Sequence, residues 1–188
     1  MFLKKILILS VVLLFSVSSF AKEKSFPEMS LFHLDSSWTN DNNKTLKLKS
    51  LENEVSIMAM VYTTCQHTCP MIMSKILDVK RKLPKDISKK VKMVLVSFDP
   101  ERDTPENLKK YREKRKLNSQ WILLTGKDSG IRSLAAVLGV NYKDEGDGIF
   151  SHSNVISVVN KEGVVVERID SLQQPIDGMV KKIIKAVK

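Results

Sequence analysis

The sequence predicts an α/β fold in which helices flank a central mixed sheet. Two continuous apolar, β-favouring runs, Val55–Tyr62 and Val91–Phe98, are typical of strands buried on both faces. A run with near-helical spacing of its apolar residues, Pro70–Leu83, follows the first of them. Further along the chain, two strand-like runs flank the turn residues Asn160–Gly163, as in a hairpin. Strand–helix–strand order followed by a hairpin indicates a sheet with both parallel and antiparallel pairs.

The chain begins with a predicted export signal. Met1–Lys5 is basic, Ile6–Val17 is almost wholly apolar, and Ser19–Ala21 supplies the small residues that a signal peptidase inspects. The apolar stretch is roughly a dozen residues, shorter than the ~20 that span a bilayer. We therefore expect cleavage after Ala21, with a retained membrane anchor as the alternative. Residues 22–188 are then expected to form one domain.

Short strands are expected to open this domain. Ser30–Trp38 and Thr45–Leu48 form a predicted hairpin around the turn-rich residues Asn40–Asn43. This extension precedes the buried strand Val55–Tyr62 and the helix Pro70–Leu83.

The middle of the chain continues the alternation of strands and helices. After the strand Val91–Phe98, Thr104 is a suitable N-cap and Pro105 a suitable first residue for a helix that runs to about Lys116. Trp121–Leu124 is the next predicted strand.

The remaining elements complete the fold. A helix at Asp128–Leu138 ends at Gly139. The predicted hairpin strands are Val155–Val159 and Val164–Ile169, and an amphipathic helix at Pro175–Val187 closes the chain. This order predicts a thioredoxin-like sandwich with an inserted helix and strand and an N-terminal β-hairpin extension.

The chain is basic, with a formal net charge of +10. Its lysines are distributed over several predicted helices and loops, without a patch that interleaves basic and aromatic residues. Nucleic acid is therefore not the expected partner. A solvated surface accounts for the charge, and steering toward an acidic protein or an anionic membrane face is the alternative.

The two cysteines of the chain, Cys65 and Cys69, lie between a predicted strand and helix. A disulfide between residues four apart closes too small a loop to restrict the unfolded chain much, so a structural role explains the pair poorly. Because a residue before proline avoids the helical region, we expect Cys69 at the N-cap and Pro70 as the first helical residue. The helix N-terminus would favour the thiolate form of both thiols. The pair therefore predicts a soft-metal site or redox chemistry.

Three histidines are candidates for a third ligand. His33 lies on the predicted hairpin and is expected to be exposed. His67 lies between the cysteines and would have to fold back within a short loop to reach a shared ion, so exposure is expected there too. His152 precedes the hairpin strand that passes beside the first helix of a thioredoxin-like fold. The residues alone leave a structural and a metal-binding role equally open for it.

Four segments resemble the Sco/SenC family, thioredoxin-like copper proteins named for the synthesis of cytochrome c oxidase. Together they span roughly Phe26 to Ile169, and they are Cys65–Pro70, Val96–Pro105, Trp121–Gly126 and His152–Ser153. The resemblance implies that Cys65, Cys69 and His152 bind one copper ion. It also implies delivery of copper to an apo-acceptor, typically the dinuclear copper centre of cytochrome c oxidase subunit II.

Ligand chemistry agrees with this implication. Cu(I) is soft and accepts two thiolates and one imidazole, the same set can hold Cu(II), and structural zinc requires four ligands.

The expected compartment is the periplasm of a Gram-negative bacterium, near the membrane surface. Asp144–Gly148 is expected to belong to a mobile loop that carries His152, or to be a solvated turn.

Some positions depart from the family pattern or leave roles open. The spacer Gln66–Thr68 lacks the proline and the acidic residue that many members have between their cysteines, which affects metal affinity and redox tuning. Asp99 and Asp103 are expected to orient the site from outside it, or, for Asp103, to belong to the helix start, and neither is expected to be a ligand. The methionines are expected to pack in the core, with transient Cu(I) contacts as the alternative; they include Met58, Met60, Met71 and Met73.

The main alternative function is enzymatic. A thiol-disulfide reductase would use Cys65 as nucleophile and Cys69 as resolving thiol, or the reverse, on the cysteines of a periplasmic partner. Dedicated oxidoreductases of this fold resemble one another in a two-residue spacer and in a proline opposite the pair, where this chain has Ser151–Ser153. A copper or redox sensor would share every residue. A thiol-disulfide reductant is a further expected partner.

Overall fold

The computed structural model describes residues 25–66 and 68–188. The predicted export signal at residues 1–21, its cleavage after Ala21, and His67 lie outside the described residues. The division into a signal and one domain at residues 22–188 therefore stays a prediction.

A seven-stranded mixed sheet forms the centre of the molecule, in the order β2-β1-β5-β4-β3-β8-β9. The three central strands β5, β4 and β3 are parallel, and the strands outside them pair antiparallel. All seven residues of β3 are buried, which agrees with its unbroken apolar sequence. The strands are β1 (Ser37–Asn40), β2 (Thr45–Lys47), β3 (Val55–Val61), β4 (Val91–Ser97), β5 (Trp121–Gly126), β8 (Ile156–Val159) and β9 (Val165–Ile169).

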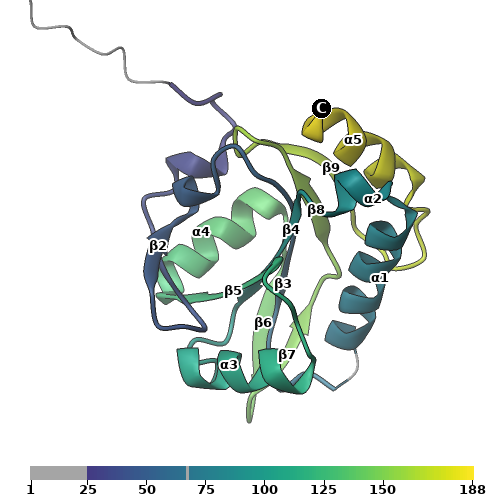
Figure 1. Cartoon of the computed structure of the whole chain (residues 1–188). Helices are drawn as coiled ribbons and strands as arrows, with labels where there is room; N and C mark the ends of the chain where they lie inside the picture. The colour runs from purple at the N-terminus through teal and green to yellow at the C-terminus, as the bar shows by residue number, and fades with distance from the viewer. Residues whose placement is uncertain (1–24, 67) are drawn as a thin grey trace, which may run out of the picture.

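Helices cover both faces of this sheet (Figure 1). Helices α1 (Thr68–Lys82) and α5 (Asp177–Val187) lie side by side on one face, and α4 (Asp128–Leu138) lies on the other. Helix α3 (Pro105–Lys114) contacts α1 through a 2.9 Å hydrogen bond that the Tyr111 hydroxyl donates to Met73 Sδ. A short helix that the sequence did not predict, α2 (Lys85–Ser88), follows α1. The predicted α/β sandwich with a mixed sheet is confirmed.

The N-terminal hairpin extends the sheet, because β1 pairs with β5 at its edge. The expected strand from Ser30 is wrong at its beginning, where a 3-10 turn, η1 (Leu31–His33), replaces it. The Ser30 hydroxyl accepts a hydrogen bond from the backbone N–H of Phe32 and caps this turn. A second 3-10 turn, η2 (Leu48–Leu51), leads into β3.

Helix α1 begins at Thr68, two residues before the predicted start at Pro70. Cys69 therefore lies in the first turn, and its expected position at the N-cap is wrong. Pro70 fits because the first turn of a helix does not need its N–H donors. The N–H of Cys69 instead donates to Cys65 Sγ over 3.3 Å, so a sulfur serves where a capping oxygen is usual.

A separate two-stranded sheet joins β6 (Tyr142–Gly146) to β7 (Ile149–His152). The expected loop or solvated turn at residues 144–148 is thus the tip of a hairpin. Its turn is built from Gly146, Asp147 and Gly148, all with positive φ. Polar residues dominate β6, so its sequence lacks the alternation that identifies a strand.

Candidate metal centre

Three side chains that are remote along the chain meet at one end of the sheet. Cys65 follows β3, Cys69 lies in the first turn of α1, and His152 ends β7. Their ligand atoms all lie within 4.8 Å of one another. Cys69 Sγ and His152 Nε2 are 3.9 Å apart. Two thiols and one imidazole at this spacing form a donor set for a single soft metal ion.

The two cysteine side chains are buried. Cys65 is 7% exposed and Cys69 is 1% exposed, and neither forms a disulfide. The backbone of Cys65 is held by a 3.3 Å hydrogen bond from its N–H to the Tyr62 carbonyl. The loop between β3 and α1 therefore turns sharply and directs both sulfurs to the same side.

Burial has the largest effect on the acidity of the Cys69 thiol. Loss of solvent raises the pKa of the Cys69 thiol, and its hydrogen bond with Cys65 raises it further. The expectation that both thiols are primed as thiolates is wrong for Cys69. Because a metal ion binds the thiolate, an arriving ion has to displace a proton from this sulfur.

His152 presents one defined nitrogen to the sulfurs. Its Nδ1 lies 3.0 Å from the Ser153 carbonyl oxygen. A carbonyl oxygen only accepts hydrogen bonds, so this contact places the ring proton on Nδ1. Nε2 then carries a free lone pair on the side that faces Cys69, as a metal-binding imidazole requires.

Aromatic rings surround the imidazole of His152. The ring centroid of Phe98 lies 5.2 Å away and that of Tyr62 lies 6.0 Å away. Phe98 also contacts Phe150 and stacks on Tyr142 at 5.1 Å, which joins the hairpin to the end of β4. These rings limit the orientations open to the imidazole. Sequence reasoning missed these rings. The available signal was the presence of two aromatic residues, Tyr142 and Phe150, on the hairpin that carries His152.

Asp103 ties the cysteine loop to the end of β4. It is fully buried and accepts hydrogen bonds from the Thr63 N–H (2.9 Å), the Thr63 hydroxyl and the Ser97 hydroxyl (2.5 Å). These contacts agree with the first of its two expected roles, orientation of the site from outside it. The second, a part in the helix start, is filled by Thr104, which caps α3. Burial raises the pKa of the Asp103 carboxyl. Asp99 is buried too, and its carboxylate pairs with Arg102.

The other candidate residues lie elsewhere or have other contacts. His33 is exposed, as expected, and its Nε2 lies 3.0 Å from the Pro27 carbonyl oxygen. The expected core packing of the methionines is confirmed for Met58, Met60 and Met73 but wrong for Met71, which is 53% exposed on α1. Within residues 25–66 and 68–188, Cys65, Cys69 and His152 are the one group with metal-binding geometry.

The same part of the chain contains no helix whose length and apolar content would let it span a bilayer.

Comparison with known proteins identifies related sequences and structures. Residues 28–188 match the family model SCO1/SenC. The SCO1 protein homolog of Bacillus subtilis is 26% identical over 152 residues, which cover 77% of this chain and 77% of that protein. The structure of Arabidopsis thaliana ScoI with copper bound is 26% identical, with a TM-score of 0.68 over 81% of this chain and 95% of that one. BsSco, a member of the Sco family of cytochrome c oxidase assembly proteins, is 28% identical, with a TM-score of 0.66 over 80% of this chain and 90% of that one.

Proposed function

We propose that the chain, which belongs to the SCO1/SenC family, is an exported copper metallochaperone. In this proposal Cys65, Cys69 and His152 hold one copper ion as Cu(I) or Cu(II), and the protein passes it to an apo-acceptor. The observation that carries the proposal is the convergence of these three ligand atoms within 4.8 Å.

The donor set favours copper over other common ions. Two thiolates and an imidazole satisfy three-coordinate Cu(I), and the nitrogen donor also suits Cu(II). Structural zinc is held by four protein ligands, and the described residues supply three. A related structure with copper bound, that of Arabidopsis thaliana ScoI, supports the same choice.

We propose the dinuclear copper centre of cytochrome c oxidase subunit II as the recipient, which agrees with the description of BsSco as a member of a family of oxidase assembly proteins. The proposed compartment is the periplasm of a Gram-negative bacterium, reached through the signal at residues 1–21 and cleavage after Ala21. The domain that handles copper, residues 22–188, would act there near the membrane surface.

Copper titration of the reduced chain from Lys22 onward tests the proposal. We expect one copper ion per chain and a visible absorption band from thiolate to Cu(II). Cys65→Ser or Cys69→Ser should abolish tight Cu(I) binding, and His152→Ala should weaken Cu(II) binding most, because imidazole suits the harder ion. His33→Ala is the matched control and should change neither. Unaltered Cu(II) binding in His152→Ala would remove this histidine from the site.

A thiol-disulfide reductase is the second candidate, because the sulfurs of the two cysteines lie within 4.8 Å of each other. In that reaction the Cys65 and Cys69 thiols are oxidised to a disulfide while a disulfide of the partner is reduced to two thiols. The raised pKa of the Cys69 thiol does not favour it as the attacking group. Disulfide turnover that survives His152→Ala and stops with either cysteine variant would identify this activity, and a copper or redox sensor would show copper binding without transfer to an acceptor.

A further inference from the structure

The positive charge of the protein is concentrated on one layer of the fold. Residues 68–90 and 177–188, which form α1, α2 and α5, contain 11 basic and 3 acidic residues, a net charge of +8. The other described residues contain 16 basic and 17 acidic residues. We call this α1–α2–α5 surface the basic layer. The helices that carry this net positive charge lie together on one side of the sheet (Figure 1).

Most of this charge is not neutralised by ion pairs. Arg81 pairs with Asp78, and Lys82 pairs with Asp177. Seven exposed lysines of the basic layer make no ion pair with any described residue; they are Lys85, Lys89, Lys90, Lys181, Lys182, Lys185 and Lys188. A large field of one sign on an open surface attracts a surface of the opposite sign.

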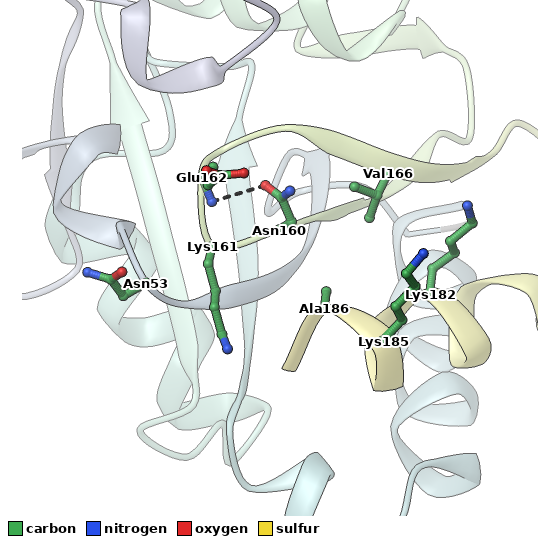
Figure 2. Close-up of a pocket in the computed structure, with 8 residues that line it drawn as sticks. All are labelled: Asn53, Asn160, Lys161, Glu162, Val166, Lys182, Lys185 and Ala186. Carbon is green, nitrogen blue, oxygen red and sulfur yellow. Dashed lines mark hydrogen bonds between the residues drawn. The ribbon is translucent and has the colours of Figure 1, made fainter. Parts of the chain in front are cut away.

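A pocket of about 470 Å³ lies where α5 meets the turn between β8 and β9, and its charged lining residues are three lysines and one acidic residue, Glu162. Lys182 and Lys185 extend from the same helix, and Lys161 extends from the turn (Figure 2). Lys161 Nζ donates to the Val187 carbonyl over 2.8 Å, so this ammonium group also offsets the negative end of α5. The pocket is large enough for a phosphate group with its substituents.

The composition of the basic layer distinguishes among anionic partners. It contains no aromatic residue on which a nucleic-acid base would stack. Ten of its 11 basic residues are lysines, and a cluster of basic residues of this kind is attracted to a surface of anionic lipid headgroups. Two exposed apolar side chains on α1, Met71 (53%) and Leu77 (38%), lie in the same layer. Apolar side chains among lysines are typical of surfaces that bind at a membrane interface.

We propose that the basic layer docks on anionic phospholipid headgroups and that the Lys161–Lys182–Lys185 pocket receives a headgroup phosphate. Cys69 is in the first turn of α1, whereas the pocket lies beside the last turns of α5, so the candidate metal centre and the pocket are at opposite ends of the layer (Figure 1). A docked molecule then keeps the metal centre at the rim of the contact, open to a second protein. This docking does not depend on copper.

Vesicle co-sedimentation tests the docking with the chain from Lys22 onward, which contains the whole sheet and core. The probes are vesicles of phosphatidylglycerol mixed with phosphatidylcholine, and vesicles of phosphatidylcholine alone. We expect binding to the anionic vesicles at low salt, loss of binding at 0.5 M salt, and no binding to the neutral vesicles. The double variant Lys182→Glu/Lys185→Glu should weaken the partition onto anionic vesicles at least tenfold.

The matched control is Lys109→Glu/Lys114→Glu on α3, which exchanges two exposed helical lysines and gives the same net charge. It should weaken binding less than twofold. Equal losses in the two variants, or no binding of the parent chain to anionic vesicles, would overturn the proposal. The proposal would also be overturned if the parent chain bound an acidic protein but no lipid, and if the α5 variant no longer bound that acidic protein. Copper titration of the same variants should match the parent, so failure of docking and failure of copper binding are separate results.

Discussion

At the scale of single residues, Asp103 positions the loop of the candidate metal centre from outside the site. Its carboxyl oxygens accept from both the N–H and the hydroxyl of Thr63, two residues before Cys65, and from the Ser97 hydroxyl. The loop that carries Cys65 is thereby fastened to the end of β4. Removal of these acceptors would leave buried donors without partners, which typically costs about 1–3 kcal/mol.

Asp103→Asn should therefore destabilise the copper-free protein, by an amount that depends on pH. The pKa of the Asp103 carboxyl is raised above its usual value of 3.8 by burial, so the folded state holds this proton more tightly than the unfolded state. The contribution of the group to stability is complete below pH 3.8 and is lost as the pH rises through the folded-state pKa. Urea unfolding from pH 3.5 to 7.5 should show the advantage of the parent over the variant shrinking as pH rises.

Asp35, an exposed carboxyl group, is a control for which the pH dependence of stability has the opposite sign. Lys47 lowers the pKa of the Asp35 carboxyl, first through a hydrogen bond and then through its charge. The advantage of the parent over Asp35→Asn should thus be present at neutral pH and disappear as pH falls. If the difference in free energy of unfolding between the parent and Asp103→Asn stays constant across this pH range, the Asp103 carboxyl does not titrate as its burial implies.

At the scale of elements, the β6–β7 hairpin sets the position of His152. An added Cβ at Gly148 would lie 2.6 Å from Arg102 Nε, whereas an added Cβ at Gly146 would meet nothing within 4 Å. Both glycines have positive φ, so alanine strains the backbone at either position. Arg102 also pairs with Asp99, which ties the hairpin turn to the loop after β4.

Gly148→Ala should cost about 1 kcal/mol more than Gly146→Ala, because only the first displaces the Arg102 side chain. It should also weaken Cu(II) binding, through a shift of Phe150 and His152, while Cu(I) binding by the cysteines stays close to that of the parent. Urea unfolding and copper titration of both variants provide the measurements. Equal stability and equal Cu(II) affinity in the two alanine variants would show that the turn does not control the histidine.

The elements also show what the sequence could and could not predict. Buried strands such as β3 and helices with clear caps such as α3 were predicted almost to the residue, because their patterns are local. The β6–β7 hairpin was missed because its strand β6 is polar and is held by contacts from Phe98, which is remote along the chain. The start of α1 was misplaced because a sulfur, and not a usual capping oxygen, accepts from its first turn. The convergence of the cysteines with His152 followed from family resemblance more than from pattern, since it depends on tertiary packing.

At the scale of the whole molecule, a bound ion would join segments that are 83 residues apart in the sequence, at Cys69 and His152. Such a link is present in the folded state and lost on unfolding. Binding therefore adds to the free energy of unfolding, by about 4 kcal/mol when free ligand is 1,000-fold above the dissociation constant.

Copper should accordingly raise the melting temperature of the reduced chain by roughly 10 °C at that excess, given 2–4 °C per kcal/mol for a domain of this size. The increase should be smaller in His152→Ala and close to zero in Cys69→Ser, because each variant removes a ligand. Scanning calorimetry with and without copper measures it. An equal increase in parent and Cys69→Ser would mean that copper stabilises the fold from another location.

The three donor atoms differ in their accessibility: the sulfurs of Cys65 and Cys69 are buried, while His152 is only partly covered. An approaching thiolate from a second protein would thus reach the ion on its imidazole side. The nitrogen would leave first, and each sulfur would be replaced only after a new bond had formed. In the proposed transfer, the ligands of this chain would be replaced one at a time in a fixed order, so the copper ion would not be released free into solution.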